Sequence, residues 1–149
     1  HDAVINVERL QFSDGAVALD ISGSAGQAFR LYQAALDRPA ESAGLGFWIY
    51  QLDHGLTLDD MVQDIIKNQP EFTQKYGANP TDTQFVNLLY ANVLHRSPDA
   101  AGYDFWVHAL ANHDTTQVGI VKFFSESPEN QTQVIGTIQD GIAYTPWAG

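Results

Sequence analysis

Apolar residues recur every three or four positions along most of this chain, which is the spacing of one face of an α-helix. The pattern predicts helices over residues 27–37 and 43–53, followed by two more whose starts are marked by Thr57 and Pro70. Further helix starts are indicated at Thr81 or Asp82, at Thr115 and at Ser127. The expected fold is therefore an all-α bundle of about eight helices.

The second group of predicted helices repeats the first at a constant offset of 58 residues. The segment from Arg38 to Trp48 corresponds to the segment from Arg96 to Trp106, and Pro70-Glu71 corresponds to Pro128-Glu129. A helical repeat whose shared residues are mostly apolar indicates a duplicated architecture. We therefore expect a duplicated bundle, with one helical repeat at 27–77 and the other at 81–138.

Two shorter segments flank these repeats. Residues 4–21 predict a β-hairpin that turns at Asp14-Gly15, pairing Phe12 with Val17, Leu10 with Leu19 and Arg9 with Asp20. Its apolar face is expected to lie on the helices. Residues 139–149 form an apolar tail that is expected to pack back onto the bundle. Because the connection between the repeats is short, we expect residues 1–149 to form a single domain.

The charge balance narrows the classes of partner. The chain has 18 acidic residues against seven lysines and arginines, which gives a net charge of −11. No basic stripe is available to replace phosphate counterions, so a nucleic-acid partner is excluded. The absence of cysteine excludes disulfides and thiolate metal sites. No apolar run approaches the roughly 20 residues of a membrane span, and the start at His1 indicates a piece of a longer protein.

Each repeat carries four motif residues at matching positions, for which a structural role is expected. The arginine follows a predicted helix end and precedes an acid by three residues, so it should bind helix-end carbonyls and hold that acid in a forked contact. The glycine should allow a close approach or a positive φ, and the Phe-Trp pair should lie in the core. The alternatives are a ligand-binding arginine and a sugar-stacking tryptophan. The motif residues are Arg38, Glu41, Gly44 and Trp48 in the first repeat and Arg96, Asp99, Gly102 and Trp106 in the second.

Aromatic rings outside the helical stripes, together with nearby polar side chains, are the candidates for ligand binding. Sugars stack on ring faces, while carboxylates and amides bind their hydroxyl groups. The candidates are Tyr50, Tyr103, Asp104, His108, Tyr144 and Trp147.

Metal binding and catalysis are not expected. The five histidines show no spacing that would place two metal ligands on one helical face, and no Asp-x-Asp-x-Asp-Gly loop is present. Calcium remains an alternative, because the surface is rich in carboxylates. No spacing of serine and histidine indicates a catalytic triad, and no glycine-rich loop could hold a phosphate. We therefore expect no enzymatic activity.

The repeated motif resembles a known family. Leu-Tyr, Leu-x-Arg-x-Pro-Asp-x-x-Gly-x-x-x-Trp, Leu and Ser-Pro-Glu are similar to the bacterial domain-of-unknown-function 4214 family, and more distantly to the helical modules of phycobilisome linker polypeptides. Two tandem repeats carry this resemblance over residues 28–133, although the first has Pro39-Ala40-Glu41 in place of x-Pro-Asp. The hairpin also resembles segments that flank calcium-binding repeats of large secreted proteins.

The resemblance implies a module of a secreted or cell-surface bacterial protein, exported by a type I route, such as an adhesin. Two functions are expected on this basis. The favoured one is a non-catalytic interaction or spacer module, and the alternative is a carbohydrate-binding module, with or without calcium. The expected partners are accordingly another surface protein or a glycan.

Overall fold

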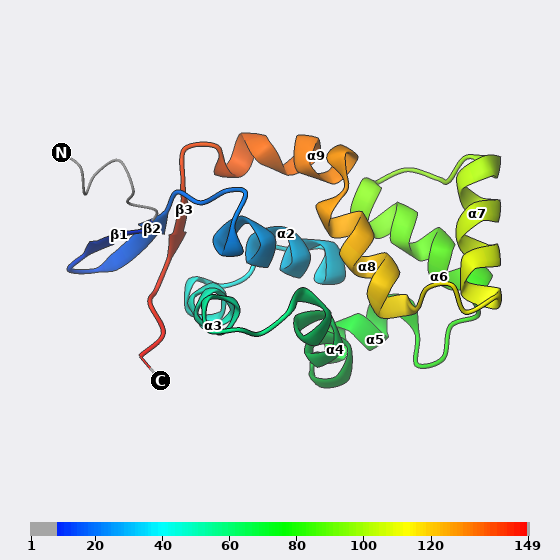
Figure 1. Cartoon of the computed structure of the whole chain (residues 1–149), viewed down its shortest axis with the longest axis horizontal. Coiled ribbons are helices and arrows are strands. Elements are labelled where there is room, and N and C mark those ends of the chain that lie inside the picture. Colours follow the sequence, from blue (N-terminus) through cyan, green and yellow to red (C-terminus); the bar gives the residue numbers. More distant parts are fainter. Residues whose placement is uncertain (1–8, 149) are drawn as a thin grey trace.

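The computed structural model describes residues 9–148 and shows a helical bundle with a small β-sheet at one end (Figure 1). The predicted all-α fold with a short N-terminal hairpin is confirmed, while hairpin residues 4–8 lie outside the described residues. The helices are α2 (Ser24–Leu36), α3 (Ser42–Asp53), α4 (Leu58–Asn68), α5 (Pro70–Tyr76), α6 (Asp82–Leu89), the π-helical turn η1 (Tyr90–Leu94), α7 (Ala100–Ala111), α8 (Gln117–Glu126) and α9 (Pro128–Ile138). The strands are β1 (Arg9–Phe12), β2 (Gly15–Ala18) and β3 (Ile142–Tyr144).

Helix α2 lies at the centre of the bundle. It contacts α3, α4, α5, α8, α9 and η1, so it joins elements from both halves of the chain (Figure 1). Its buried Arg30 donates to both carboxylate oxygens of Glu126 on α8, at 2.9 and 2.6 Å. The sheet and α7 lie at opposite ends of the molecule (Figure 1).

The bounds of the helices recur at the offset seen in the sequence. Shifted by 58 residues, α3 coincides with α7, and α2 coincides with α6 together with η1. The ends of α4 and α8 also correspond, but α8 begins one residue late because its N-cap is Thr116 rather than the predicted Thr115. The Thr57–Asp60 capping box and the caps at Thr81 and Ser127 form as the sequence predicts.

The hairpin differs from the prediction in register and in orientation. The turn is at Ser13-Asp14, so Phe12 pairs with Gly15 and Leu10 with Val17. Leu10, Phe12 and Leu19 are 38–59% exposed, whereas Ala16 and Ala18 on the other face of β2 belong to the core. The small side chains therefore face the bundle, and the predicted apolar face does not.

The C-terminal tail packs on the bundle, and it also completes the sheet. Strand β3, which the sequence analysis missed, pairs antiparallel with β2. The Thr145 amide then donates to the Ser42 carbonyl of α3 at 3.0 Å. Within residues 9–148, no helix combines the length and the apolarity that a membrane crossing requires.

Candidate functional site

The two motif arginines make the same forked contact in both halves. Arg38 donates through Nε and Nη2 to the carboxylate of Glu71, at 2.6 and 2.7 Å. Arg96 donates in the same way to Glu129, at 2.8 and 3.0 Å. Each glutamate lies in the first turn of the last helix of its half. We call these two pairs the arginine clamps, and each ties the loop after one helix to the start of another.

The partners of the arginines were predicted incorrectly. Glu41 is only a secondary acceptor of Arg38, at 3.2 Å, and Asp99 instead caps α7 by accepting from the Gly102 amide at 3.0 Å. The helix-end carbonyls are not the acceptors either, because Arg38 and Arg96 each donate to the carbonyl of the next residue. The signal that could have identified the glutamates was the recurrence of Pro-Glu at the same offset as the arginines.

The clamps leave the guanidinium groups occupied. Arg38 lies 5.2 Å from the ring centroid of Tyr32, and Arg96 lies 5.1 Å from that of Tyr90. The hydrogen bonds from each arginine lower the pKa of its glutamate below the usual value and raise the pKa of the guanidinium. Paired groups of this kind stabilise the loops, and this supports the structural role over the ligand-binding alternative.

The motif glycines are not equivalent. A Cβ at Gly102 would lie 2.5 Å from the Tyr90 hydroxyl and 2.6 Å from Asp99 Oδ1. A Cβ at Gly44 would meet nothing closer than Glu41 Oε1 at 4.0 Å, so the predicted close approach there is wrong. The crowded glycine of α3 is Gly46, where a Cβ would overlap the Thr145 carbonyl.

The two Phe-Trp pairs also differ. Trp48 is buried, and Phe47 is half-buried with its ring edge against Trp147, at 5.3 Å between centroids. In the second half Trp106 is only half-buried, and Phe105 is 63% exposed. The prediction that both pairs lie in the core is therefore wrong for Phe105.

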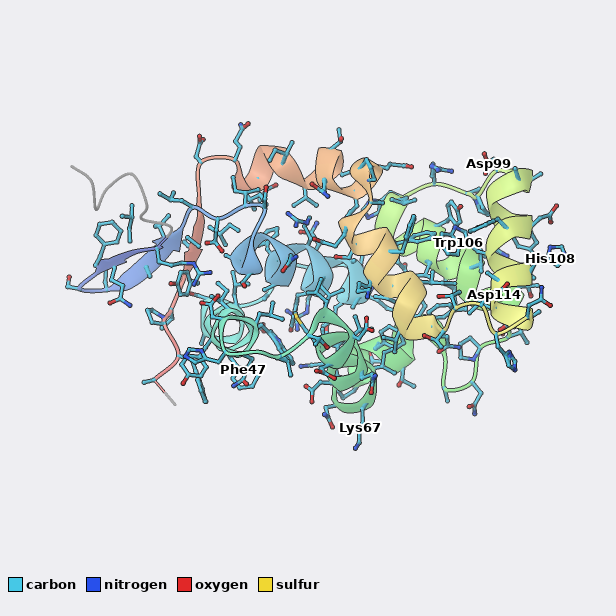
Figure 2. All side chains as sticks on the ribbon, viewed as in Figure 1. Phe47, Lys67, Asp99, Trp106, His108 and Asp114 are labelled. Carbon is cyan, nitrogen blue, oxygen red and sulfur yellow. The ribbon has the colours of Figure 1, made fainter. Side chains whose placement is uncertain are left out.

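The six candidate ligand-binding residues lie in two places rather than one. Tyr50, Tyr144 and Trp147 meet at the sheet end of the molecule, on α3, β3 and the tail. Tyr103, Asp104 and His108 all belong to α7 at the other end (Figures 1 and 2). No single site can use all six.

At the sheet end, α3 and the tail enclose a hollow of about 340 Å³, which we call the α3 hollow. Its exposed rings are Tyr50 and Trp147, 39% and 37% exposed, with centroids 4.8 Å apart. Tyr144 also lines it but is 6% exposed, so it offers no ring face to a ligand, contrary to its selection as a stacking candidate. The polar wall is Arg9, which donates to Asp53 at 2.6 Å and to Asp20 at 2.7 Å.

On α7, Asp104 and His108 are exposed and Tyr103 is half-buried. Figure 2 shows His108 on the outer side of the helix and Trp106 on the side that faces α8. The rings of Phe105, Trp106 and Phe123 form a continuous line, with successive centroids 4.9 Å apart, and we call it the aromatic ridge. Phe123 on α8 is 56% exposed. The sequence analysis missed Phe105 as a surface residue because its neighbour Trp106 fits the apolar stripe of α7, and it missed Phe123 because Phe123 itself fits the stripe of α8.

The described residues contain no group of three or more histidines and carboxylates that could hold a metal ion. The arrangement offers ring faces, an apolar ridge and carboxylates, which are the components of a binding surface.

A model of the family described as a domain of unknown function (DUF4214) matches residues 63–134. The match begins within α4 and ends within α9, so it includes the second motif and both glutamates of the clamps. It supports the resemblance that the motif indicates. Neither the comparison with curated proteins nor the comparison with solved structures gave a match.

Proposed function

We propose that this chain, whose residues 63–134 match a family of unknown function, is a non-catalytic interaction module of a larger secreted or cell-surface protein. Its binding surface is the aromatic ridge on α7 and α8. The partner is another protein, and the rest of the bundle holds this surface rigidly at one end of the molecule.

The observation that carries this proposal is the exposure of the ridge. Phe105 and Phe123 are 63% and 56% exposed, and they flank the half-buried Trp106. Contiguous exposed aromatic rings are costly to leave in water, and they are typical of protein-binding surfaces. The counterpart Phe47 in the first half is instead covered by Trp147, so the exposure does not follow from the motif itself.

We also take the first half to be a diverged copy of the second half, which holds most of the family match. The recurrence of the helix bounds and of the arginine clamp at 58 residues supports this. The distant similarity to phycobilisome linker modules is part of the same proposal, since those modules are also helical and non-catalytic.

Site-specific cross-linking tests the interaction surface. A photo-reactive amino acid placed at Phe105 in the full-length parent protein, displayed on its own cell, should attach to one partner protein. The same amino acid at Gln63, which is exposed on α4, is the matched control and should give no such product. Equal attachment from both positions would refute the proposal.

Carbohydrate binding is the second candidate, and the α3 hollow favours it. The partly exposed rings of Tyr50 and Trp147 lie beside the carboxylate of Asp53, which is a combination that sugar recognition uses, although one face of Tyr50 is stacked on His54. The volume of the α3 hollow, about 340 Å³, is at the small end for ligand sites, so a short glycan is the ligand to test.

Titration of tryptophan fluorescence with oligosaccharides, with and without calcium, tests this second candidate. A saturable change that is lost in Trp147→Ala and kept in Phe105→Ser would support a glycan site at the α3 hollow. A response that survives Trp147→Ala, or the lack of any response, would exclude it.

A further inference from the structure

The first half of the molecule shows how one motif helix is covered. On α3, the residues Ser42, Gly46, Phe47 and Tyr50 form a stripe along which the tail runs in an extended conformation. Thr145 is bonded to the Ser42 carbonyl, and the Trp147 ring contacts both Phe47 and Tyr50. At the far end of the same helix, Arg9 pairs with Asp53. The cover therefore combines an extended backbone, one aromatic ring and one cation.

The corresponding stripe of α7 is open. Of the twelve residues of α7, all of which the structure describes, only Leu110 is buried. The exposed stripe contains Ala100, Asp104, Phe105 and His108, which occupy the positions of the four α3 residues at the 58-residue offset. On the side of α7 that faces α8, a separate hollow of about 230 Å³ has Tyr90, Trp106 and Phe123 in its wall.

Charge defines what could cover this stripe. Asp104 lies on α7, and Asp99 and Asp114 lie near its two ends (Figure 2). None of the three forms an ion pair among the described residues. The cations nearby are already engaged, Arg96 by Glu129 and Lys122 by Asp59 at 2.9 Å. An acidic rim around exposed rings favours a basic partner and repels anionic lipid and nucleic acid.

We propose that the α7 stripe binds an extended segment of another protein that carries one aromatic side chain next to a lysine or arginine. The aromatic side chain packs on Phe105 of the aromatic ridge, as Trp147 packs on Phe47, and the cation pairs with Asp104. This inference rests on the proposed function and names the chemistry of its partner. Buried aromatic anchors dominate the energy of such interfaces, while rim charges set which partner is chosen.

The tail of a second copy is not the occupant. On α3 the Thr145 carbonyl comes so close that only a glycine fits at position 46, and α7 has Asp104 at the matching position. The same tail could not approach α7 in the same way, and the residues that run along α3, 145–148, include no cation to pair with Asp104.

A random heptapeptide library displayed on phage tests the inference on the whole chain. Selection on the immobilised protein, with counter-selection on the Phe105→Ser, Phe123→Ser double variant, should enrich peptides with an aromatic residue beside a lysine or arginine. For an enriched peptide, Phe105→Ser should weaken the Kd at least about tenfold. Asp104→Asn should weaken it about two- to fivefold.

Two matched controls locate the binding. Phe12→Ser removes an exposed ring at the other end of the molecule, and Asp64→Asn removes a charge from α4, so neither should change the Kd. Circular dichroism confirms that each variant remains folded. Peptides that depend on the ridge but are acidic or lack an aromatic residue would overturn this inference and leave the proposed interaction surface standing. No enrichment, or peptides that bind the double variant equally well, would overturn both.

Discussion

The two motif glycines make different demands on the backbone around them. Gly44 lies in the first turn of α3 with free space where a Cβ would be, whereas Gly102 is held against Tyr90 and the capping carboxylate of Asp99. Gly44→Ala should therefore stabilise the protein by about 0.5–1 kcal/mol through helix propensity. Gly102→Ala should destabilise it by about 1 kcal/mol, because the cap is displaced. Thermal denaturation of the pair measures both, and a change of the same sign in both would contradict this account.

The arginine clamps should also differ in strength. The Arg38 and Glu71 side chains are 34% and 35% exposed, and Arg38 also donates to the Tyr32 hydroxyl at 3.0 Å. Arg96 and Glu129 are each 43% exposed. We expect Arg38→Ala to cost about 1–2 kcal/mol of unfolding free energy and Arg96→Ala less than about 1 kcal/mol. Urea denaturation measures this, and a larger loss for Arg96→Ala would show that exposure does not govern the clamps.

His95 of the second half binds Asp37 of the first half, and the two residues occupy matching positions at the 58-residue offset. His95 Nε2 is 3.1 Å from Asp37 Oδ1, and Nδ1 is 3.1 Å from Gln133 Oε1. The amide nitrogen of Gln133 donates to the Val93 carbonyl, so its oxygen faces the ring. A doubly protonated ring satisfies both acceptors, and these bonds, Asp37 first, raise the pKa of His95 above its usual value.

The raised pKa of His95 gives a prediction with a defined sign. The contribution of the protonated ring to stability is complete below the unfolded pKa of about 6.5 and is lost as the pH rises through the higher folded value. The melting temperature of the wild type should therefore exceed that of His95→Gln by more at pH 5 than at pH 8. Since the side chain is 54% exposed, the effect stays below about 1 kcal/mol. His108→Gln on α7 is the control, and a pH-independent difference for His95→Gln would refute the prediction.

At the scale of elements, the helices could be predicted from the sequence because their signals are local. Thr57 with Asp60, Thr81 with Gln84 and Ser127 before Pro128 each mark a helix start within one turn of chain. The hairpin register could not be predicted in this way. Asp14-Gly15 is the favoured local turn, but the pairing of β2 with β3 and the burial of Ala16 and Ala18 select the turn one residue earlier.

The same distinction between local signals and long-range contacts explains which parts of the candidate site could be predicted. The repeat predicts the same environment for Phe47 and Phe105, because their sequence motifs match. Their environments differ because the tail after β3 covers α3, whereas no described segment covers α7 in the same way. The arginine clamps join residues 33 positions apart, so local spacing pointed instead to the nearer acids, Glu41 and Asp99.

At the scale of the whole molecule, the two halves should fold as one unit. Helix α2 of the first half contacts α8, α9 and η1 of the second. Without α2, Glu126 on α8 would lose its ion-pair partner Arg30. A fragment of residues 78–149 should therefore show no cooperative thermal transition, whereas the whole chain should show one. Sharp melting of a monomeric fragment would mean that the second half is independent.

The central claim is that one architecture occurs twice, with its binding face covered on α3 and open on α7. Thermal unfolding of Phe47→Ser and Phe105→Ser, two equal changes at matching positions, tests it most directly. Phe47→Ser should lower stability by about 1–3 kcal/mol, because it removes the ring that packs between Trp48 and Trp147. Phe105→Ser should leave stability within about 0.5 kcal/mol of the wild type, because its ring is largely in solvent. Equal losses in the two variants would show that Phe105 belongs to the core and would contradict the account.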